Sequence, residues 1–124
     1  MNDTTAYKIL TADQWAALAA DSFAGSPHDQ ADGFIHLSTA AQLAGTLDLH
    51  FAGQKGLVIA AIDLMALGRA VRWEPSRQGQ LFPHVYAPLN RGAVIASCPV
   101  ERDATGAVRL PQGRRKDTPP SDWD

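Results

Sequence analysis

The octapeptide Asp-Gly-Phe-Ile-His-Leu-Ser-Thr, residues 32–39, gathers several groups that could do chemistry within one short stretch. An apolar strand pattern carries His36 in its middle and runs directly into Ser38 and Thr39. Thr39 stands three residues before Gln42, which is the spacing of a capping box at a helix start. Because the free N–H groups and the dipole of a helix start attract anions, we predict a ligand site here.

The same residues also have a plainer, structural interpretation. His36 alternates with Phe34 and Ser38 on one strand face, and a partly buried histidine bonded to a neighbour is the commoner outcome. One of the two hydroxyls, that of Ser38 or Thr39, is accounted for as a helix cap worth about 1 kcal/mol. The other hydroxyl is left without a structural explanation, which favours a binding role for the segment.

A second polar group surrounds a glycine-containing loop further along the chain and comprises Glu74, Arg77, His84 and Tyr86. Glu74 could act as a general base or hold a sugar hydroxyl, and Arg77 could bind a phosphate or carboxylate through two hydrogen bonds. The alternative is a surface Glu–Arg ion pair of little energetic consequence. His84 could equally be structural, since Pro83 restricts the backbone and Tyr86 could bond to the imidazole.

The four histidines of the chain do not show the spacing of a recognised metal site. There is no H-x-x-x-H pair and no Cys/His ligand pattern, and Cys98 is the only cysteine. His50 is expected near the C-terminal end of a helix, where its charge suits the dipole. We therefore predict no metal site, although residues distant in sequence could still assemble one. Cys98 is predicted to be a buried small hydrophobe.

The elements that must position these groups follow from hydrophobic periodicity. Apolar and β-prone runs predict strands over residues 7–10, 34–38, 57–62, 70–74, 82–86, 93–100 and 107–110. Helical spacing predicts helices over residues 11–20 and 40–51, and a helical turn that Gly68 ends. Turn-forming residues predict a loop over residues 24–33 and a hairpin turn over residues 103–106. Pro83 indicates an edge strand or a strand start.

Length and composition place these elements in one small domain. A chain of 124 residues is long enough for one core, and helices that come early with strands that come late favour an α+β domain over residues 1–110. Residues 111–124 carry tandem prolines and charges without periodicity, which predicts a disordered tail.

The net charge and the composition of individual segments limit the classes of partner that we expect for this chain. The net charge of −2 provides no basic field for nucleic acid, and the basic residues near the C-terminus are interspersed with aspartates. No run approaches the roughly 20 apolar residues that a membrane span needs, and the N-terminus lacks the pattern of a secretory signal. A single cysteine fits a reducing compartment, so we expect a cytoplasmic protein with a small-molecule ligand.

Several of these segments together resemble the bacterial family called domain of unknown function 952. The resemblance covers roughly residues 6–97 and is carried by the motifs Gly-Phe-Ile-His-Leu-Ser and Phe-Pro-His-x-Tyr. Between the motifs stand Gln42-Leu43, Ile62-Asp63 and Glu74. The family has no established activity, so this resemblance implies a site without implying its chemistry.

More distantly, the chain is similar to RNA 2′-phosphotransferases in the order of its elements. A His-Leu-Ser strand is followed by a helix, by an apolar strand that ends in Asp63, and then by Glu74. Those enzymes belong to the ADP-ribosyltransferase-like superfamily, and the resemblance implies a split, mostly antiparallel sheet with two main helices. It implies a cleft for NAD or an ADP-ribosyl group, in which His36 and Ser38 contact the ribose–nicotinamide part. Glu74 would stabilise an oxocarbenium-like state at the ribose C1′, with help from Arg77.

This chain departs from the superfamily at Tyr7-Lys8, where members usually carry His or Arg, and has only Arg77 where the phosphotransferases use several arginines. The leading interpretation is an ADP-ribosyltransferase-like domain that binds NAD or an ADP-ribose-containing nucleotide in a cleft and acts as an ADP-ribosyl or related transferase, with NAD as the expected substrate. Its expected catalytic residues are His36 and Glu74, and its expected ligand contacts are Ser38, Thr39, Arg77, His84 and Tyr86. The alternative is a non-catalytic module that binds a small molecule or a protein in the same cleft, and a purely structural role for these residues is the third.

Overall fold

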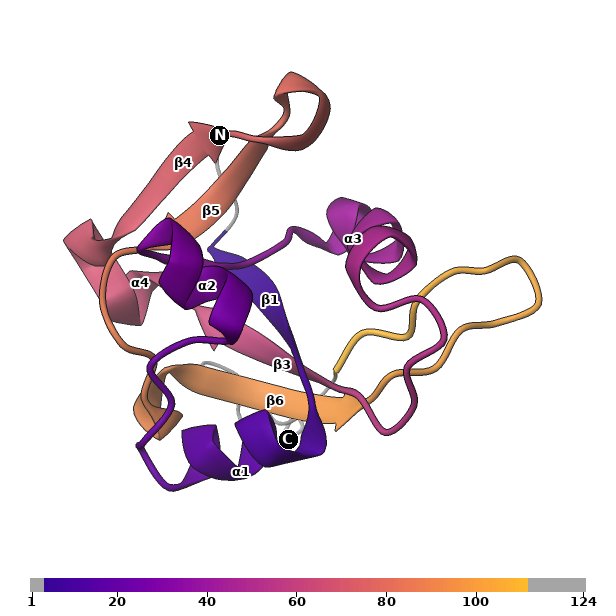
Figure 1. Ribbon diagram of the computed structural model, residues 1–124, viewed down its shortest axis with the longest axis horizontal. Helices are drawn as coiled ribbons and strands as arrows, with labels where there is room; N and C mark the ends of the chain where they lie inside the picture. The colour runs from indigo at the N-terminus through magenta and orange to yellow at the C-terminus, as the bar shows by residue number, and fades with distance from the viewer. Residues whose placement is uncertain (1–3, 112–124) are drawn as a thin grey trace, which may run out of the picture.

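Two antiparallel three-stranded sheets organise the computed structural model, which describes residues 4–111 (Figure 1). The first sheet has the order β1-β3-β6, built from β1 (Thr5–Leu10), β3 (Val58–Asp63) and β6 (Val94–Pro99). The second has the order β2-β5-β4, built from β2 (Ile35–His36), β5 (Leu81–Val85) and β4 (Val71–Pro75). All named strand pairs run antiparallel, which confirms the predicted α+β class.

Short helices connect the strands. They are α1 (Ala12–Ala19), α2 (Pro27–Asp32), α3 (Leu43–His50) and α4 (Leu64–Leu67), with 3₁₀ turns η1 (Ala40–Gln42), η2 (Gly68–Ala70), η3 (Arg77–Gly79) and η4 (Arg91–Ala93). The helix predicted from residue 11 is present and begins with its capping box. Thr11 Oγ1 accepts the Gln14 N–H at 3.2 Å, and Gln14 Oε1 accepts the Thr11 N–H at 2.9 Å. The helix predicted over residues 40–51 is divided into η1 and α3.

The loop predicted over residues 24–33 is wrong, because this segment contains α2. Ser26 and Asp29 form a reciprocal capping box, with Ser26 Oγ 3.1 Å from the Asp29 N and Asp29 Oδ2 2.9 Å from the Ser26 N. Pro27 occupies the first turn, and Gly33 ends the helix in the left-handed region with a φ of 85°. These are ordinary start and stop signals, but an aspartate takes the place of the usual Glu or Gln.

The two sheets meet through the chain that follows β2. That strand is shorter than predicted, and two residues beyond it Ser38 forms a bridge to Tyr7 of β1, with N···O distances of 2.8 and 2.9 Å. Between them the Leu37 N–H donates to Pro83 O at 3.1 Å. Residues 36–38 therefore lie where the sheets converge.

The edge strand or strand start predicted from Pro83 is wrong, because Pro83 lies in the middle of β5, the central strand of its sheet. Pro83 pairs with Trp73 on one side, and its carbonyl faces Leu37 on the other. In an antiparallel strand the N and O of one residue point to the same side. The Pro83 nitrogen, which carries no hydrogen, therefore faces the chain beyond the last residue of β2. A two-residue β2 therefore lets a proline sit in a central strand.

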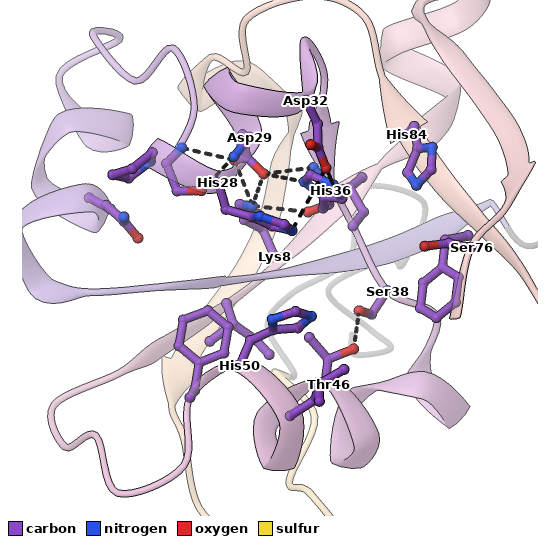
Figure 2. Close-up of a pocket in the computed structure, with 18 of the residues that line it drawn as sticks. Lys8, His28, Asp29, Asp32, His36, Ser38, Thr46, His50, Ser76 and His84 are labelled. Atoms are coloured by element: carbon purple, nitrogen blue, oxygen red, sulfur yellow. Dashed lines mark hydrogen bonds and ion pairs between the residues drawn. The ribbon is translucent and has the colours of Figure 1, made fainter. Parts of the chain in front are cut away.

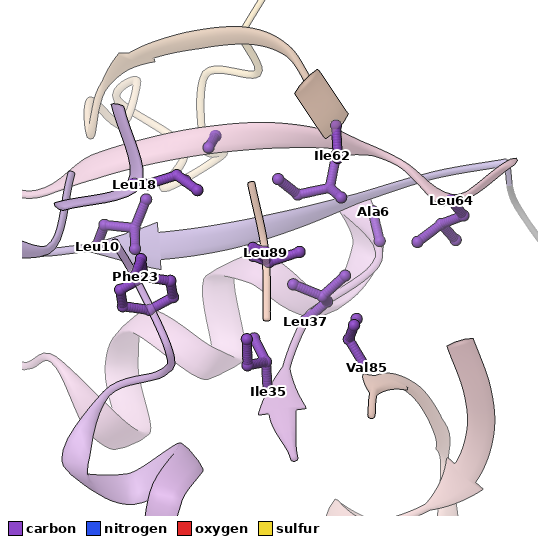
Figure 3. Close-up of a cluster of buried hydrophobic side chains, with 12 residues drawn as sticks. Ala6, Leu10, Leu18, Phe23, Ile35, Leu37, Ile62, Leu64, Val85 and Leu89 are labelled. Atoms are coloured by element: carbon purple, nitrogen blue, oxygen red, sulfur yellow. The ribbon is translucent and has the colours of Figure 1, made fainter. Parts of the chain in front are cut away.

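The first sheet is apolar on both faces, and a charged residue interrupts one of them. On one face the core comprises Ala6, Leu10, Leu18, Phe23, Ile35, Leu37, Ala60, Ile62, Leu64, Val85, Leu89 and Ala93 (Figure 3). On the other, Ile9 and Ile59 pack with Leu43 and Leu47 of α3. Lys8 shares its strand face with Ala6 and Leu10 and is 6% exposed. A buried ammonium requires an anionic partner, so we expect a buried carboxylate beside Lys8.

The C-terminal part of the described chain contains one predicted turn but lacks one predicted strand. At residues 103–106 the Asp103 carboxylate accepts the N–H groups of Thr105 and Ala107 at 2.9 and 3.1 Å. The strand predicted over residues 107–110 is wrong, since only a single bridge pairs Arg102 with Val108. Beyond Pro111 the predicted tail lies outside the described residues. Within residues 4–111 no helix has the length and apolar character that crossing a membrane requires.

Candidate functional site

A cavity of about 750 Å³ lies where the two sheets converge, and all four histidines of the chain line it (Figure 2). Their rings form a continuous row: the His50 centroid is 5.3 Å from that of His28, His28 is 4.4 Å from His36, and His36 is 5.4 Å from His84. The row draws on α2, β2, α3 and β5, so residues from 28 to 84 converge on one space. We call these four residues the histidine row.

A buried carboxylate organises the wall of the cavity formed by α2. Asp29 is 1% exposed, and its oxygens accept hydrogen bonds from the Ser26 and His36 N–H groups. Asp29 Oδ2 is 2.8 Å from Lys8 Nζ, which gives the buried ammonium the partner that it requires. Burial alone would raise the pKa of Asp29, but the His36 hydrogen bond and the Lys8 charge hold it well below its usual range.

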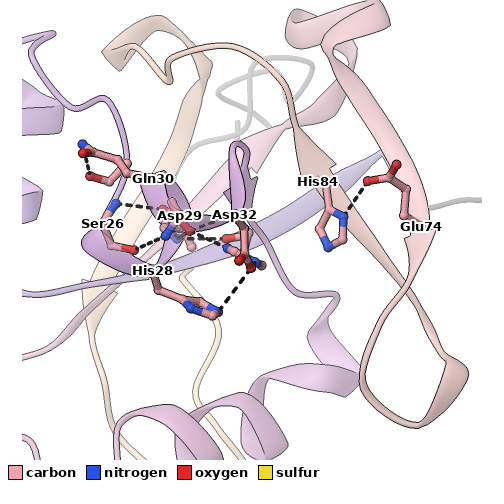
Figure 4. Close-up of polar contacts among 10 residues, drawn as sticks. Ser26, His28, Asp29, Gln30, Asp32, Glu74 and His84 are labelled. Carbon is pink, nitrogen blue, oxygen red and sulfur yellow. Dashed lines mark hydrogen bonds and ion pairs between the residues drawn. The ribbon is translucent and has the colours of Figure 1, made fainter.

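His36 is fixed between the carboxylates of Asp29 and Asp32, two residues of α2 that are labelled in Figure 4. Its Nδ1 is 2.6 Å from Asp29 Oδ1, and its Nε2 is 2.9 Å from Asp32 Oδ2. His28, four residues before Asp32 on α2, places its Nε2 3.9 Å from the same Asp32 oxygen. We call His28, Asp29, Asp32 and His36 the histidine end of the cavity.

On another side of the cavity the Arg77 side chain carries a positive charge that no carboxylate of residues 4–111 pairs with. The Arg77 guanidinium lies 3.4 Å from Thr46 Oγ1 and from Gln42 O, and 4.9 Å over the Phe82 ring. Among residues 4–111 no carboxylate forms an ion pair with it. Ser38 Oγ is 3.0 Å from Thr46 Oγ1. We call Arg77, Ser38 and Thr46 the guanidinium end.

A glycine on α3 makes the guanidinium end possible. A Cβ atom on Gly45 would lie 3.1 Å from Arg77 Nη2, so glycine lets the guanidinium approach the helix backbone. His50 lies on the same helix, and nearby charges affect its pKa. Burial lowers the pKa of His50, and the nearby His28, Arg77 and His36 lower it further. The Arg77 guanidinium makes this side of the cavity complementary to an anion.

His84 reaches the cavity from β5 with a carboxylate behind it. Its Nδ1 is 2.8 Å from Glu74 Oε1, and the same oxygen accepts a 2.7 Å hydrogen bond from the Tyr86 hydroxyl. These two bonds lower the pKa of Glu74. Phe34 stacks on the buried His84 ring at 4.1 Å. With Nδ1–H directed at Glu74, the neutral imidazole leaves Nε2 as an acceptor.

The structure divides the residues predicted from sequence into two groups. Those that line the cavity are His36, Ser38, Arg77 and His84; those that do not are Thr39, Glu74 and Tyr86. Thr39 has its N–H bonded to Gln42 Oε1 at the start of η1. Glu74 and Tyr86 lie behind His84, so Glu74 acts on the cavity only by orienting that imidazole.

Sequence reasoning missed the lining residues Lys8, His28, Asp29, Asp32, Thr46 and His50. A signal for part of this group is present in the sequence, because His28, Asp32 and His36 follow one another at intervals of four. A search restricted to histidine and cysteine spacing passes over it, since the middle residue is an aspartate. Assigning residues 24–33 to a loop also concealed that His28 and Asp32 share a helix face.

The same fold occurs in a solved structure of protein CC0527 from Caulobacter crescentus, a structural genomics target. Its X-ray structure is 42% identical, with a TM-score of 0.77 over 86% of this chain and 95% of that chain. Its solution NMR structure gives a TM-score of 0.71 at the same identity, over 86% of this chain and 91% of that chain. No curated protein matches the sequence.

A protein family described as "Protein of unknown function (DUF952)" matches residues 9–97. This match spans most of the chain and includes both motifs on which the family resemblance rests. The more distant likeness to ADP-ribosyltransferase-like proteins stays a prediction. The chain belongs to the DUF952 family.

Proposed function

We propose that the cavity binds a small, phosphate-bearing molecule, with an ADP-ribosyl nucleotide such as NAD as the first candidate. The observation that carries this proposal is the half-buried Arg77 guanidinium, which lines the cavity without a carboxylate partner among residues 4–111. A guanidinium in this state is complementary to a phosphate, because its N–H groups match two phosphate oxygens. A volume of about 750 Å³ falls in the range of small-molecule sites.

The neighbouring groups suit the rest of such a ligand. The Ser38 and Thr46 hydroxyls, 3.0 Å apart, can donate to a phosphate or to a ribose hydroxyl beside Arg77. His36 and Ser38, which the superfamily resemblance assigns to the ribose–nicotinamide part, line the same cavity. These positions support an ADP-ribosyl ligand over an isolated phosphate.

His84 is the group best placed to act as an acid or base if the ligand is turned over. Glu74 holds its Nδ1 at 2.8 Å, so that Nε2 is the basic nitrogen. In an ADP-ribosyl transfer, nicotinamide would leave the ribose C1′, an acceptor oxygen would bond there, and the proton of that oxygen would pass to Nε2. Glu74 then has an orienting role, in place of the direct contact with the ribose that the sequence predicted.

Calorimetric titration with ADP-ribose, NAD, pyrophosphate and ribose 5-phosphate tests the binding proposal. Arg77→Ala is expected to weaken the binding of the phosphate-bearing ligands by about 10- to 100-fold, which corresponds to the loss of charge-assisted hydrogen bonds. Arg69→Ala is the matched control, because Arg69 is exposed and does not line the cavity. Binding of none of these ligands at millimolar concentration, or an unchanged affinity in Arg77→Ala, would contradict the proposal.

Nicotinamide release from NAD separates a transferase from a binding module. A transferase releases nicotinamide in the presence of an acceptor, and His84→Gln should reduce the rate while ADP-ribose still binds. NAD that binds without any nicotinamide release favours the non-catalytic alternative.

A further inference from the structure

We propose that His28, Asp32 and His36 bind one divalent transition-metal ion at the histidine end of the cavity. One ligand atom from each residue lies within 4.8 Å of the other two. His36 Nε2 and His28 Nε2 are 2.9 and 3.9 Å from the same Asp32 oxygen. The inference is independent of the anion proposed at the guanidinium end.

The distances between these atoms fit a shared ion after a small movement. Metal–ligand bonds of about 2.0–2.2 Å place adjacent donor atoms roughly 3 to 3.5 Å apart. The His36–Asp32 pair, at 2.9 Å, lies just below this range, so the larger movement is that of His28 toward the other two residues. Its side chain is 57% exposed, so rotation of that side chain costs little packing.

The sequence places the three ligands on two consecutive structural elements. His28 and Asp32 are four residues apart on α2, which puts them on one face of the helix. Gly33 ends the helix with a φ of 85°, and the chain then returns so that His36 on β2 faces Asp32. An H-x-x-x-D-x-x-x-H sequence is thereby converted into a compact donor set.

The surroundings of His36 are those of a metal-ligating histidine. Its Nδ1 bonds to the buried Asp29 at 2.6 Å, and Asp29 is itself held by Lys8 and by the Ser26 N–H. A carboxylate on the far nitrogen fixes the ring and makes the near nitrogen a better ligand. The near nitrogen, Nε2, lies 2.9 Å from Asp32 Oδ2, and an ion bound between the two atoms would replace this contact.

Two imidazoles and one carboxylate define the class of ion. Nitrogen donors favour Zn²⁺, Fe²⁺, Co²⁺ and their neighbours over Ca²⁺ and Mg²⁺, which prefer oxygen. Three protein ligands also leave coordination positions open toward the cavity. The His50 ring is 5.3 Å from that of His28, and its imidazole has no hydrogen bond among residues 4–111, so His50 is a candidate further donor.

Metal titration of the full chain tests the site. After removal of metal with a chelator, the protein is titrated with Co²⁺ or Zn²⁺ alone by calorimetry, and Co²⁺ binding is followed by its visible absorption. We expect one ion per chain, and at least a tenfold weaker affinity in His28→Ala and in Asp32→Asn. Both substituted side chains are partly exposed, so these variants should fold, which circular dichroism would verify.

One further variant makes the test specific. Asp13→Asn alters an exposed aspartate on α1 that does not line the cavity, and this variant should bind the ion as the wild type does. Wild-type protein that binds less than one ion per chain would overturn the proposal. So would His28→Ala and Asp32→Asn variants that keep the wild-type affinity, or Ca²⁺ that binds as tightly as Zn²⁺.

Discussion

The two ends of the cavity satisfy their charges in opposite ways. At the histidine end both nitrogens of His36 face carboxylates, and the buried Asp29 accepts from three residues. At the guanidinium end Arg77 donates hydrogen bonds to the neutral oxygens of Thr46 and Gln42 at 3.4 Å, and no carboxylate of residues 4–111 pairs with it. A carboxylate-rich histidine cluster is complementary to a cation, and an unpaired guanidinium is complementary to an anion. One cavity therefore offers two different kinds of site.

The ends also differ in how firmly they are held. Asp29 is tied to α2, to β1 through Lys8 and to β2 through His36, so the histidine end is part of the fold itself. Arg77 comes from η3, and its contacts with the neighbouring helix are long hydrogen bonds. Mutation of the buried Asp29 should therefore reduce stability, and mutation of Arg77 should weaken anion binding.

Asp29→Ala should give the largest effect on stability. The variant leaves the Lys8 ammonium buried without its partner and removes the acceptor of two backbone N–H groups. Breaking a buried ion pair in this way costs about 3–5 kcal/mol. Urea unfolding in metal-free buffer measures the loss, and Asp13→Ala serves as the exposed control with an effect below about 0.5 kcal/mol. A loss of less than 1 kcal/mol in Asp29→Ala would contradict the claim that the histidine end contributes more to stability than the guanidinium end.

The stability that Asp29 contributes should decrease in acid. Its pKa is depressed in the folded protein, so the contribution is complete above the ordinary aspartate pKa of about 3.9 and is lost as the pH falls below it. The difference in unfolding free energy between wild type and Asp29→Asn should therefore be constant from pH 7 to pH 5 and shrink toward pH 3. Unfolding curves at each pH measure it. A difference that grows in acid would contradict the charged state assigned to Asp29.

Gly45→Ala should have a smaller effect and should separate binding from stability. The added Cβ lies 3.1 Å from Arg77 Nη2, which is the end of a flexible side chain and can move aside. Alanine in the middle of α3 raises stability by up to about 1 kcal/mol, while the displaced guanidinium weakens pyrophosphate binding. Thermal unfolding and calorimetry measure the two changes. A stability loss with unchanged pyrophosphate affinity would show that Arg77 packs against α3 without binding an anion.

The sequence predicted more of the guanidinium end than of the histidine end. Ser38 belongs to the Gly-Phe-Ile-His-Leu-Ser motif, and Arg77 belongs to the polar group around the glycine-containing loop, so two of the three residues of this end were predicted. At the histidine end only His36 was identified. The Ser26–Asp29 capping box was overlooked because its segment is rich in glycine, proline and aspartate. Without a predicted helix there, the relative positions of His28, Asp29 and Asp32 could not be predicted.

Long-range pairing accounts for the remaining differences. Nothing near Lys8 in the sequence indicates that its partner is Asp29, 21 residues away, because that contact depends on how α2 packs against β1. The central place of Pro83 depends in the same way on β2 being two residues long. The helix that begins after Thr11 was predicted correctly, because its Thr11–Gln14 capping box and apolar spacing are local patterns that need no distant partner.

The central claim, that one cavity binds a cation at its histidine end and an anion at its guanidinium end, is tested most directly by anomalous diffraction. Crystals of the full chain would be soaked with Co²⁺ and pyrophosphate, and the scattering measured at the cobalt edge. The account predicts one anomalous peak bound by His28, Asp32 and His36, and phosphate density against Arg77. A cobalt peak away from these three residues, or phosphate that avoids Arg77, would contradict it.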